Sequence, residues 1–165
     1  MRQLIALLVL FAALTSCERD DLCIQDQPTS PRLVIVFKDA IDQVSIKTVP
    51  SLQVTTLGSN TPAPLDFAGT QTITAADTIA LPLRNSFDLT SYNFLNTEDN
   101  STQTSSIDFN AMRQEEFISR ACGFRTLYSE LTATAINPDT GWIRGINVVN
   151  TSVQSNNVVH VEIFH

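Results

Sequence analysis

The sequence predicts an all-β protein: an antiparallel β-sandwich of Greek-key type, immunoglobulin-like or jelly-roll-like, with about eight or nine strands. Short runs of β-branched and aromatic residues alternate along the chain with turn-forming Pro, Gly, Asn and Asp. After the N-terminal region no long stripe of apolar residues follows helical spacing, and the one weak helix candidate is 111–117. A chain of 165 residues is long enough for one hydrophobic core, so residues 32–165 are predicted to form a single domain.

The first candidate strand is 32–37, with the sequence RLVIVF. Its apolar residues occupy both faces, which predicts a central strand that is covered on both sides. The next β-rich segment, 44–57, contains Pro50. Because proline cannot donate to a ladder, this segment is predicted to be an edge strand, a bulged strand or two short strands.

The middle of the chain shows several strand patterns separated by polar sequence. Residues 78–83 alternate apolar and polar positions around Pro82, which suits another edge strand. Short period-two patches follow over 87–94, and Ile107 and Phe109 mark a further strand. Residues 96–106, NTEDNSTQTSS, are polar throughout and are predicted to form an exposed loop.

The C-terminal part contains three more strand candidates. Residues 131–136 and 142–149 flank the turn 137–141, whose sequence NPDTG suits a reversal of the chain. The last pattern has Val159 and Val161 on one face, so His160 on the other face is predicted to point to solvent.

The N-terminal segment 1–16 reads as a cleaved secretory signal peptide. Arg2 precedes an apolar run over 4–14 that is too short to span a bilayer, and small residues follow it. Leu14-Thr15-Ser16-Cys17 resembles the lipobox of bacterial lipoproteins, in which the cysteine sulfur receives a diacylglycerol. The resemblance implies that Cys17 is lipidated and becomes the first mature residue, so that 17–31 is an anchor and tether in the cell envelope.

Charge limits the partners of the mature chain. Nine Lys and Arg against seventeen Asp and Glu give a net charge of −8 after the signal peptide is removed. An acidic protein of this kind lacks the basic stripe that nucleic acid requires, so the membrane is expected to be contacted through the lipid on Cys17. The run Glu18-Arg19-Asp20-Asp21 resembles, with departures, the surface-export address of Bacteroidota lipoproteins; a solvated spacer is the alternative.

Cys23 and Cys122 remain once Cys17 is assigned to the anchor. An even number of cysteines in an exported chain predicts a disulfide between them, 99 positions apart. The alternative is a reactive thiol pair, but the sequence contains no Cys-x-x-Cys motif that would lower a thiol pKa.

No catalytic set, metal site or cofactor is predicted. The chain has two histidines, His160 and His165, no Gly-x-Ser-x-Gly motif and no glycine-rich phosphate loop. The two histidines do not show the spacing of a zinc site. Residues 96–100 carry Asn96, Glu98 and Asp99 but lack the glycine and spacing of an EF-hand, so we interpret them as a solvated turn rather than a calcium site.

Two weaker features of the sequence suggest a surface role. Trp142, Tyr92 and Tyr128 are the candidates for an aromatic platform that binds a glycan, although aromatic side chains more often fill a core. Asp77-Thr78-Ile79 resembles the O-glycosylation signal of Bacteroidota envelope proteins, with an ordinary strand residue as the alternative for Thr78.

The segments Cys17–Cys23 (CERDDLC), 31–37 (PRLVIVF) and 117–124 (FISRACGF) together resemble an uncharacterised family of Bacteroidota lipoproteins with a domain of unknown function. The resemblance implies a location, one compact β domain and a paired cysteine, but no activity. We therefore expect an outer-membrane lipoprotein that acts as a non-enzymatic protein- or glycan-binding module. The alternative is a hydrolase of envelope or extracellular polymer whose residues come together only in the fold.

Overall fold

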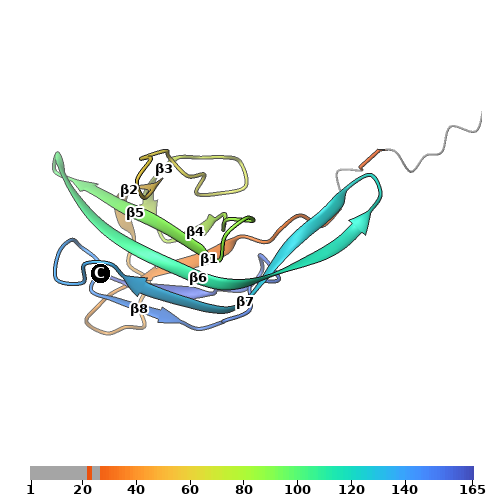
Figure 1. Cartoon of the computed structure of the whole chain (residues 1–165). Coiled ribbons are helices and arrows are strands. Elements are labelled where there is room, and N and C mark those ends of the chain that lie inside the picture. Colours follow the sequence, from red (N-terminus) through yellow and green to blue (C-terminus); the bar gives the residue numbers. More distant parts are fainter. Residues whose placement is uncertain (1–21, 24–26) are drawn as a thin grey trace, which may run out of the picture. The chain divides into compact units, whose positions relative to one another are not determined.

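The structure, a computed structural model, describes Leu22, Cys23 and residues 27–165. Its regular elements in this part of the chain are nine strands in two sheets, which confirms the predicted β-sandwich (Figure 1). The signal peptide and Cys17 lie outside the described residues. The strands are β1 (Leu33–Lys38), β2 (Val49–Thr56), β3 (Thr72–Ala76), β4 (Thr78–Leu81), β5 (Leu89–Glu98), β6 (Ser101–Ser119), β7 (Gly123–Ala135), β8 (Gly145–Val148) and β9 (Val161–Phe164).

The chain forms two compact units. One consists of Met1–Pro28 with Glu116–Arg125, and the other of Thr29–Glu115 with Thr126–His165. The second unit contains the sandwich core. The first contains the end of β6, the start of β7 and the turn between them, whereas the sequence alone placed 116–125 in the same domain as the rest.

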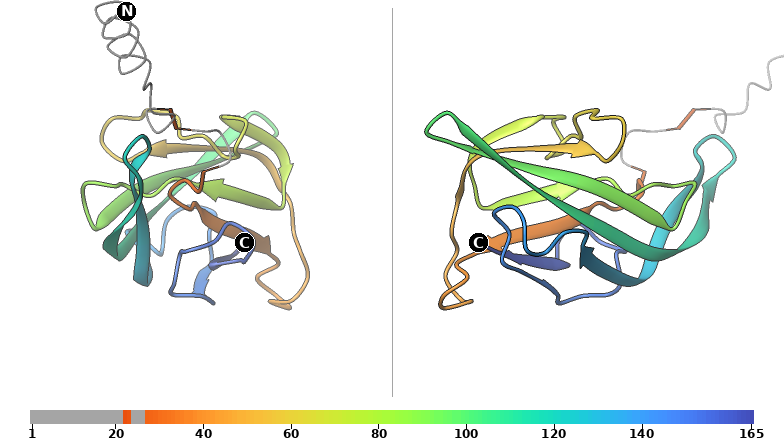
Figure 2. Two further views of the ribbon diagram at one scale, coloured as in Figure 1. Left: turned by 90° about the vertical axis from the view of Figure 1, so that its right-hand side faces the viewer. Right: turned by 60° about the vertical axis from the view of Figure 1, so that its left-hand side comes forward.

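The sandwich has a four-stranded sheet, ordered β4-β1-β9-β8, and a five-stranded sheet, ordered β3-β2-β5-β6-β7. Figure 2 shows the two sheets as layers, with β2 and β5 in one and β1 in the other. The side chains between the layers form one apolar core. Its largest fully buried members are Phe37, Phe94, Phe109, Leu33, Ile35, Leu52, Leu65, Leu81, Ile107, Leu131 and Ile163.

β1 is the inner strand that its sequence predicts, because Leu33 through Phe37 are all buried. It pairs with β4 on one side and with β9 on the other. The β1–β9 pair is parallel, with Ile35 opposite Val161, and is an exception to the expected antiparallel arrangement.

The predicted loop over 96–106 is wrong. Residues up to Glu98 belong to β5 and those from Ser101 belong to β6, in continuous antiparallel register from Leu89 opposite Asn110 to Glu98 opposite Ser101. Only Asp99 and Asn100 form the turn, with φ of 49° and 63°. Polar side chains occur here because this part of the ladder is largely exposed, and asparagine and aspartate tolerate the positive φ of a two-residue hairpin.

The helix candidate at 111–117 is also wrong, because these residues belong to β6. No described helix is long and apolar enough to cross a membrane.

The predictions based on Pro82 and Pro50 have different outcomes. β4 is an edge strand, as predicted, and Pro82 follows it directly. β2 is instead one unbroken inner strand, and the register continues past Pro50 from Val49 opposite Ala76 to Ser51 opposite Thr74. Proline is accommodated there because the pairing of β2 with β5 begins only at Leu52.

Candidate functional site

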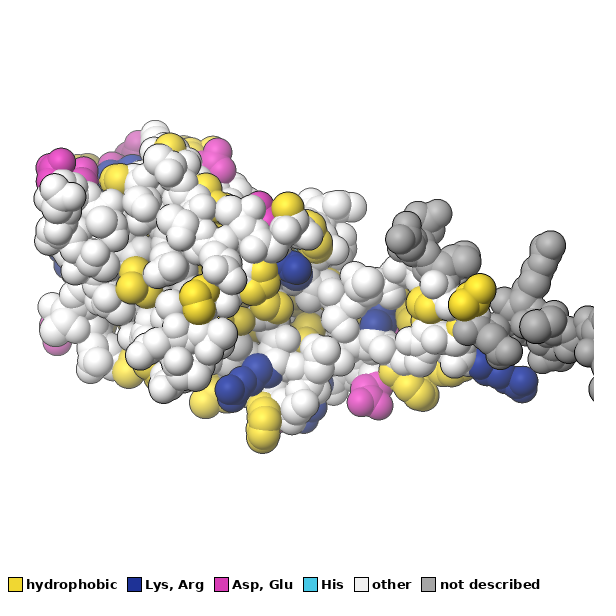
Figure 3. Space-filling view, turned by 90° about the horizontal axis from the view of Figure 1, so that it is seen from above, with side chains coloured by type: hydrophobic (Ala, Val, Ile, Leu, Met, Phe, Trp, Pro, Cys, Tyr) yellow, Lys and Arg dark blue, Asp and Glu magenta, His cyan; other side chains and the backbone are white. Residues whose placement is uncertain are grey.

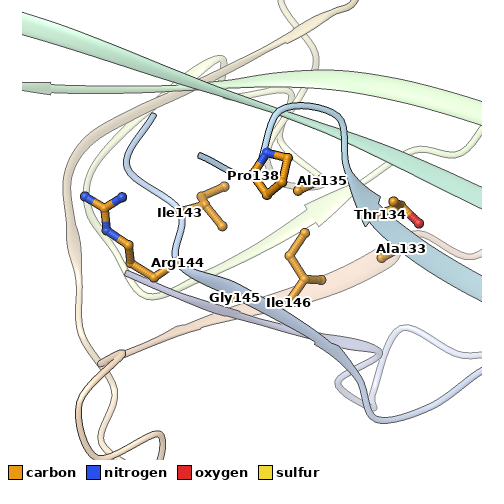
Figure 4. A pocket seen from close by; sticks show the side chains of 8 residues that line it. All are labelled: Ala133, Thr134, Ala135, Pro138, Ile143, Arg144, Gly145 and Ile146. Atoms are coloured by element: carbon orange, nitrogen blue, oxygen red, sulfur yellow. The ribbon is translucent and has the colours of Figure 1, made fainter. Parts of the chain in front are cut away.

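A groove of about 340 Å³ lies where the end of β7, the following connection and the start of β8 meet. Figure 4 shows Pro138, Ile143 and Ile146 gathered around its centre, whereas the Arg144 side chain points away from them. The exposed lining is somewhat more apolar than polar, and Arg144 at the rim is exposed. The full lining is Ala133, Thr134, Ala135, Pro138, Ile143, Arg144, Gly145 and Ile146.

The connection between β7 and β8 is held in place by Ser105 of β6. The Ser105 hydroxyl oxygen accepts hydrogen bonds from the backbone N–H of Trp142 (3.0 Å) and of Ile143 (3.1 Å). The Trp142 indole N–H donates to the carbonyl oxygen of Phe94 at 2.9 Å. Gly141 precedes this anchor with φ of 99°, a conformation that glycine adopts without strain. The groove wall at Ile143 is therefore set by buried hydrogen bonds rather than by a free loop.

β7 and β8 are the terminal strands of their respective sheets, so the groove lies at an open edge of the sandwich. A neighbouring segment covers the middle of β7: the Leu131 N–H donates to the Thr151 carbonyl at 3.0 Å, and Tyr128 and Val153 form a bridge. The later residues Ala133 and Ala135 line the groove instead. Backbone groups at such an edge are suited to pair with an added strand.

The proposed glycan platform does not exist at the surface. Tyr92, Tyr128 and Trp142 are all buried in the core. Each polar atom has an internal partner, since the Tyr92 hydroxyl donates to the Pro82 carbonyl at 2.6 Å and the Tyr128 hydroxyl bonds to Asn85 at 2.6 Å. Burial raises the pKa of both tyrosines to about 12. These aromatic residues therefore fill the interior, which was the alternative that the sequence left open.

His160 does not point to solvent, and its exposed fraction is 0%. It lies before the first residue of β9, so the strand alternation used to place it does not extend to this position. Its Nδ1 accepts a hydrogen bond from the Val34 N–H at 3.0 Å, while Nε2 has no partner among the described residues. This arrangement requires neutral imidazole with the proton on Nε2.

Burial lowers the pKa of His160 below its ordinary value of 6.5. The unfolded chain therefore binds a proton first as the pH falls, so this residue stabilises the fold fully above about pH 6.5 and progressively less towards its lowered pKa. In that window we expect the free energy of unfolding to fall with a slope approaching about 1.4 kcal/mol per pH unit. Urea unfolding of wild type and His160→Asn between pH 5 and 8 measures this contribution.

In His160→Asn the amide oxygen can still accept the Val34 hydrogen bond but does not titrate, so the variant is the matched control. The pH dependence between 5 and 6.5 is expected to be weaker in the variant than in wild type. Parallel curves for the two proteins would contradict a neutral buried His160.

The other histidine, His165, lies against the aromatic core. Its ring packs edge-on against Phe37 and Trp142, and its Nε2 lies 3.0 Å from the Lys47 carbonyl.

Within the described part of the chain no three His, Cys, Asp or Glu residues lie close enough together to hold a metal ion.

The acidic turn between β5 and β6 lines a second, smaller hollow of about 260 Å³. Its walls are Asn96, Glu98, Asp99, Ser101 and Gln103, of which only Glu98 and Asp99 are acidic. Figure 3 shows one face of the molecule on which uncharged surface predominates and charged side chains are scattered. Among the described residues that line this hollow, Glu98 and Asp99 supply two carboxylates, and no other acidic side chain could bind a metal ion.

The remaining predicted site residues do not line the groove. Cys23 and Cys122 form a disulfide within the smaller unit, with Cα atoms 4.8 Å apart, consistent with the expected pairing. Thr78 is the exposed first residue of β4. The sequence did not single out the groove; its only signal was the turn 137–141, whose Pro138 contributes to the lining.

No curated protein matches the chain significantly. No solved structure matches it significantly either. One family model, a family of unknown function named DUF6452, matches residues 51–165, which include all the lining residues of the groove. Because the match covers more than half of the sequence, the chain belongs to the DUF6452 family.

Proposed function

We propose that this protein is an outer-membrane lipoprotein, anchored by a lipid on Cys17, whose groove between β7 and β8 binds an extended segment of a protein partner. The observation that carries the proposal is the apolar groove between the terminal strands of the two sheets. The anchor rests on the lipobox resemblance of residues 14–17.

The chemistry of the lining favours a polypeptide over a sugar. Exposed Pro138 and half-buried Ile146 offer contacts to aliphatic side chains, and the edge of β7 offers backbone groups to a strand. Sugars bind β-sandwiches mainly through exposed aromatic faces, but the three candidate aromatic residues are buried. A peptide with alternating apolar residues therefore suits the groove better than a glycan.

Arg144 defines a second requirement. Its guanidinium is exposed at the rim, where its Nη1 donates to the Gly141 carbonyl at 3.3 Å and keeps further N–H groups available. A carboxylate on the peptide can accept from these groups in a charge-assisted hydrogen bond. The preferred peptide thus carries Asp or Glu next to its apolar residues.

The hydrolase alternative gains no support from this groove. Its described lining residues provide one hydroxyl, from Thr134, but no carboxylate, imidazole or thiol to act as a base. His160 is fully buried and its Nδ1 is occupied by the Val34 N–H. No observation in the described residues therefore favours a second candidate function.

A random peptide library displayed on phage tests the binding proposal. Selection on the wild-type protein is expected to enrich peptides with alternating apolar residues and an Asp or Glu. Ala133→Trp fills the groove with an indole ring and is expected to weaken binding of a selected peptide at least tenfold, about 1.4 kcal/mol. Fluorescence anisotropy with the labelled peptide measures the change in Kd.

Two variants make this test specific. Thr74→Trp adds the same ring at an exposed position of β3, the opposite edge strand of the same sheet, and is expected to leave Kd unchanged. Arg144→Glu is expected to shift the selected acidic position to Lys or Arg. Peptides that bind Ala133→Trp as tightly as wild type, or an unchanged acidic preference in Arg144→Glu, would rule out the groove as the site.

A further inference from the structure

We propose that Phe117 and Phe124, at the hairpin end of β6 and β7, insert into the membrane interface beside the lipid anchor. This inference rests on the proposed lipidation of Cys17. It assigns a lipid-contacting surface to the smaller unit, whereas the peptide groove belongs to the sandwich unit.

The two phenylalanines form a paired but exposed aromatic surface. Their ring centroids lie 5.3 Å apart with the planes at 64°, an edge-on arrangement across the hairpin. The exposed fractions are 57% for Phe117 and 63% for Phe124, so each ring contacts the other and still presents most of its surface to solvent. Large aromatic side chains left exposed together mark a contact surface more often than an isolated exposed residue does.

The charge of the hairpin end does not oppose contact with a lipid surface. The Arg125 guanidinium forms an ion pair with Glu116, and Arg120 lies in the turn between the strands. Residues 116–125 thus carry a net charge of +1, whereas the whole chain carries −7. The hairpin end therefore adds no further repulsion from anionic headgroups to that of the acidic tether Glu18-Arg19-Asp20-Asp21.

The disulfide restricts the hairpin end to the neighbourhood of the anchor. Cys23 is six residues after Cys17, and six residues span at most about 22 Å of extended chain. Its partner Cys122 lies in the hairpin turn, with the Cα atoms 4.8 Å apart. This reach is shorter than the hydrocarbon thickness of a bilayer, roughly 30 Å, so a lipidated Cys17 keeps the turn close to the membrane surface.

A lipid interface is accordingly the occupant that fits best. Interfacial aromatic side chains are a recurrent membrane contact, and one lipid-bearing segment commonly needs a second contact for stable binding. Leu22, which is 80% exposed and adjoins Cys23, adds a third apolar side chain next to the bridge.

Tryptophan fluorescence in vesicles tests the proposal. The full-length lipidated protein with Phe124→Trp is reconstituted into phosphatidylcholine and phosphatidylglycerol vesicles in which part of the phosphatidylcholine carries brominated acyl chains. The matched control is Phe87→Trp, because Phe87 is 62% exposed but belongs to the sandwich unit. Both variants retain buried Trp142 as a common background.

We expect brominated lipid to reduce the emission added by the residue 124 tryptophan at least twofold and to leave the emission added at residue 87 unchanged. Adding Cys122→Ser to Phe124→Trp opens the bridge and is expected to restore most of that emission. Equal quenching at both positions, or none at residue 124, overturns the insertion of the hairpin end. Quenching that persists without the bridge overturns the role of the disulfide in positioning it.

Vesicle flotation separates this result from failure of the anchor. Wild type is expected to float with the vesicles and Cys17→Ser is expected to remain largely in the soluble fraction. Flotation of both proteins or of neither overturns the lipid anchor itself. Anchored wild type combined with an unquenched residue 124 tryptophan overturns only the interface contact.

Discussion

Replacing Cys23 and Cys122 together with serine is expected to lower the free energy of unfolding by up to about 4.7 kcal/mol, the value that the chain-entropy model gives for a loop of roughly 100 residues. The bridge joins positions 99 residues apart, so its loss releases residues 23–122, which include β1 to β6, from a closed loop in the unfolded state. For a chain of this size the melting temperature should fall by about 10–18 °C. Urea unfolding followed by circular dichroism measures the difference.

Reduced wild type is the control for this experiment. Dithiothreitol opens the same loop without changing a side chain, so reduced wild type and the double serine variant are expected to unfold at the same urea concentration. A double variant as stable as oxidised wild type would show that the bridge does not constrain the unfolded chain.

Gly141→Ala is expected to destabilise the protein by roughly 2–5 kcal/mol, since strain and overpacking act at the same position. A Cβ atom there would lie 2.3 Å from the Ser105 hydroxyl oxygen and 2.5 Å from the Thr104 carbonyl oxygen. The φ of 99° disfavours any residue with a side chain. The same change would displace the Ser105 hydroxyl that anchors Trp142 and Ile143, so peptide binding in the groove should weaken as well.

Gly58→Ala separates the two causes. Gly58 has a similar φ of 90°, but no atom lies within 4 Å of the added Cβ, so only the conformational strain of about 1–2 kcal/mol is expected. Thermal unfolding of both variants gives the comparison. Equal losses at the two positions would mean that the close contact with Ser105 contributes nothing.

The hydrophobic pattern of the sequence was sufficient to predict the position of two strands in their sheet. The run LVIVF predicted an inner strand, and β1 is buried on both faces. Alternation over 78–83, with Pro82 on one face, predicted an edge strand, and β4 occupies the edge. In both cases the distribution of apolar residues along the segment is enough to indicate the environment of the strand.

Tertiary context decided the places where the pattern failed. Residues 101–106 are polar yet form a ladder with β5, because the backbone pairing of a long hairpin does not need apolar side chains on its exposed part. His160 is buried because the chain approaches β1 before β9 begins, where its ring accepts the Val34 N–H. Neither environment can be read from the residues nearby in sequence.

The groove was beyond sequence reasoning for a related reason. It combines the ends of strands from two different sheets, and its wall at Ile143 is fixed by Ser105, 38 positions earlier. The aromatic residues that the sequence did single out fill the interior, which is where large apolar side chains contribute most to stability.

The parallel pairing of β1 with β9 has a consequence for the order of assembly. Ile35 lies opposite Val161, so the inner strand β1 lacks one neighbour until residues 161–164 have been synthesised. Contacts this distant along the chain favour slow folding and leave nascent polypeptide without a stable structure for longer. The four-stranded sheet therefore completes its hydrogen bonding only when almost the entire chain is available.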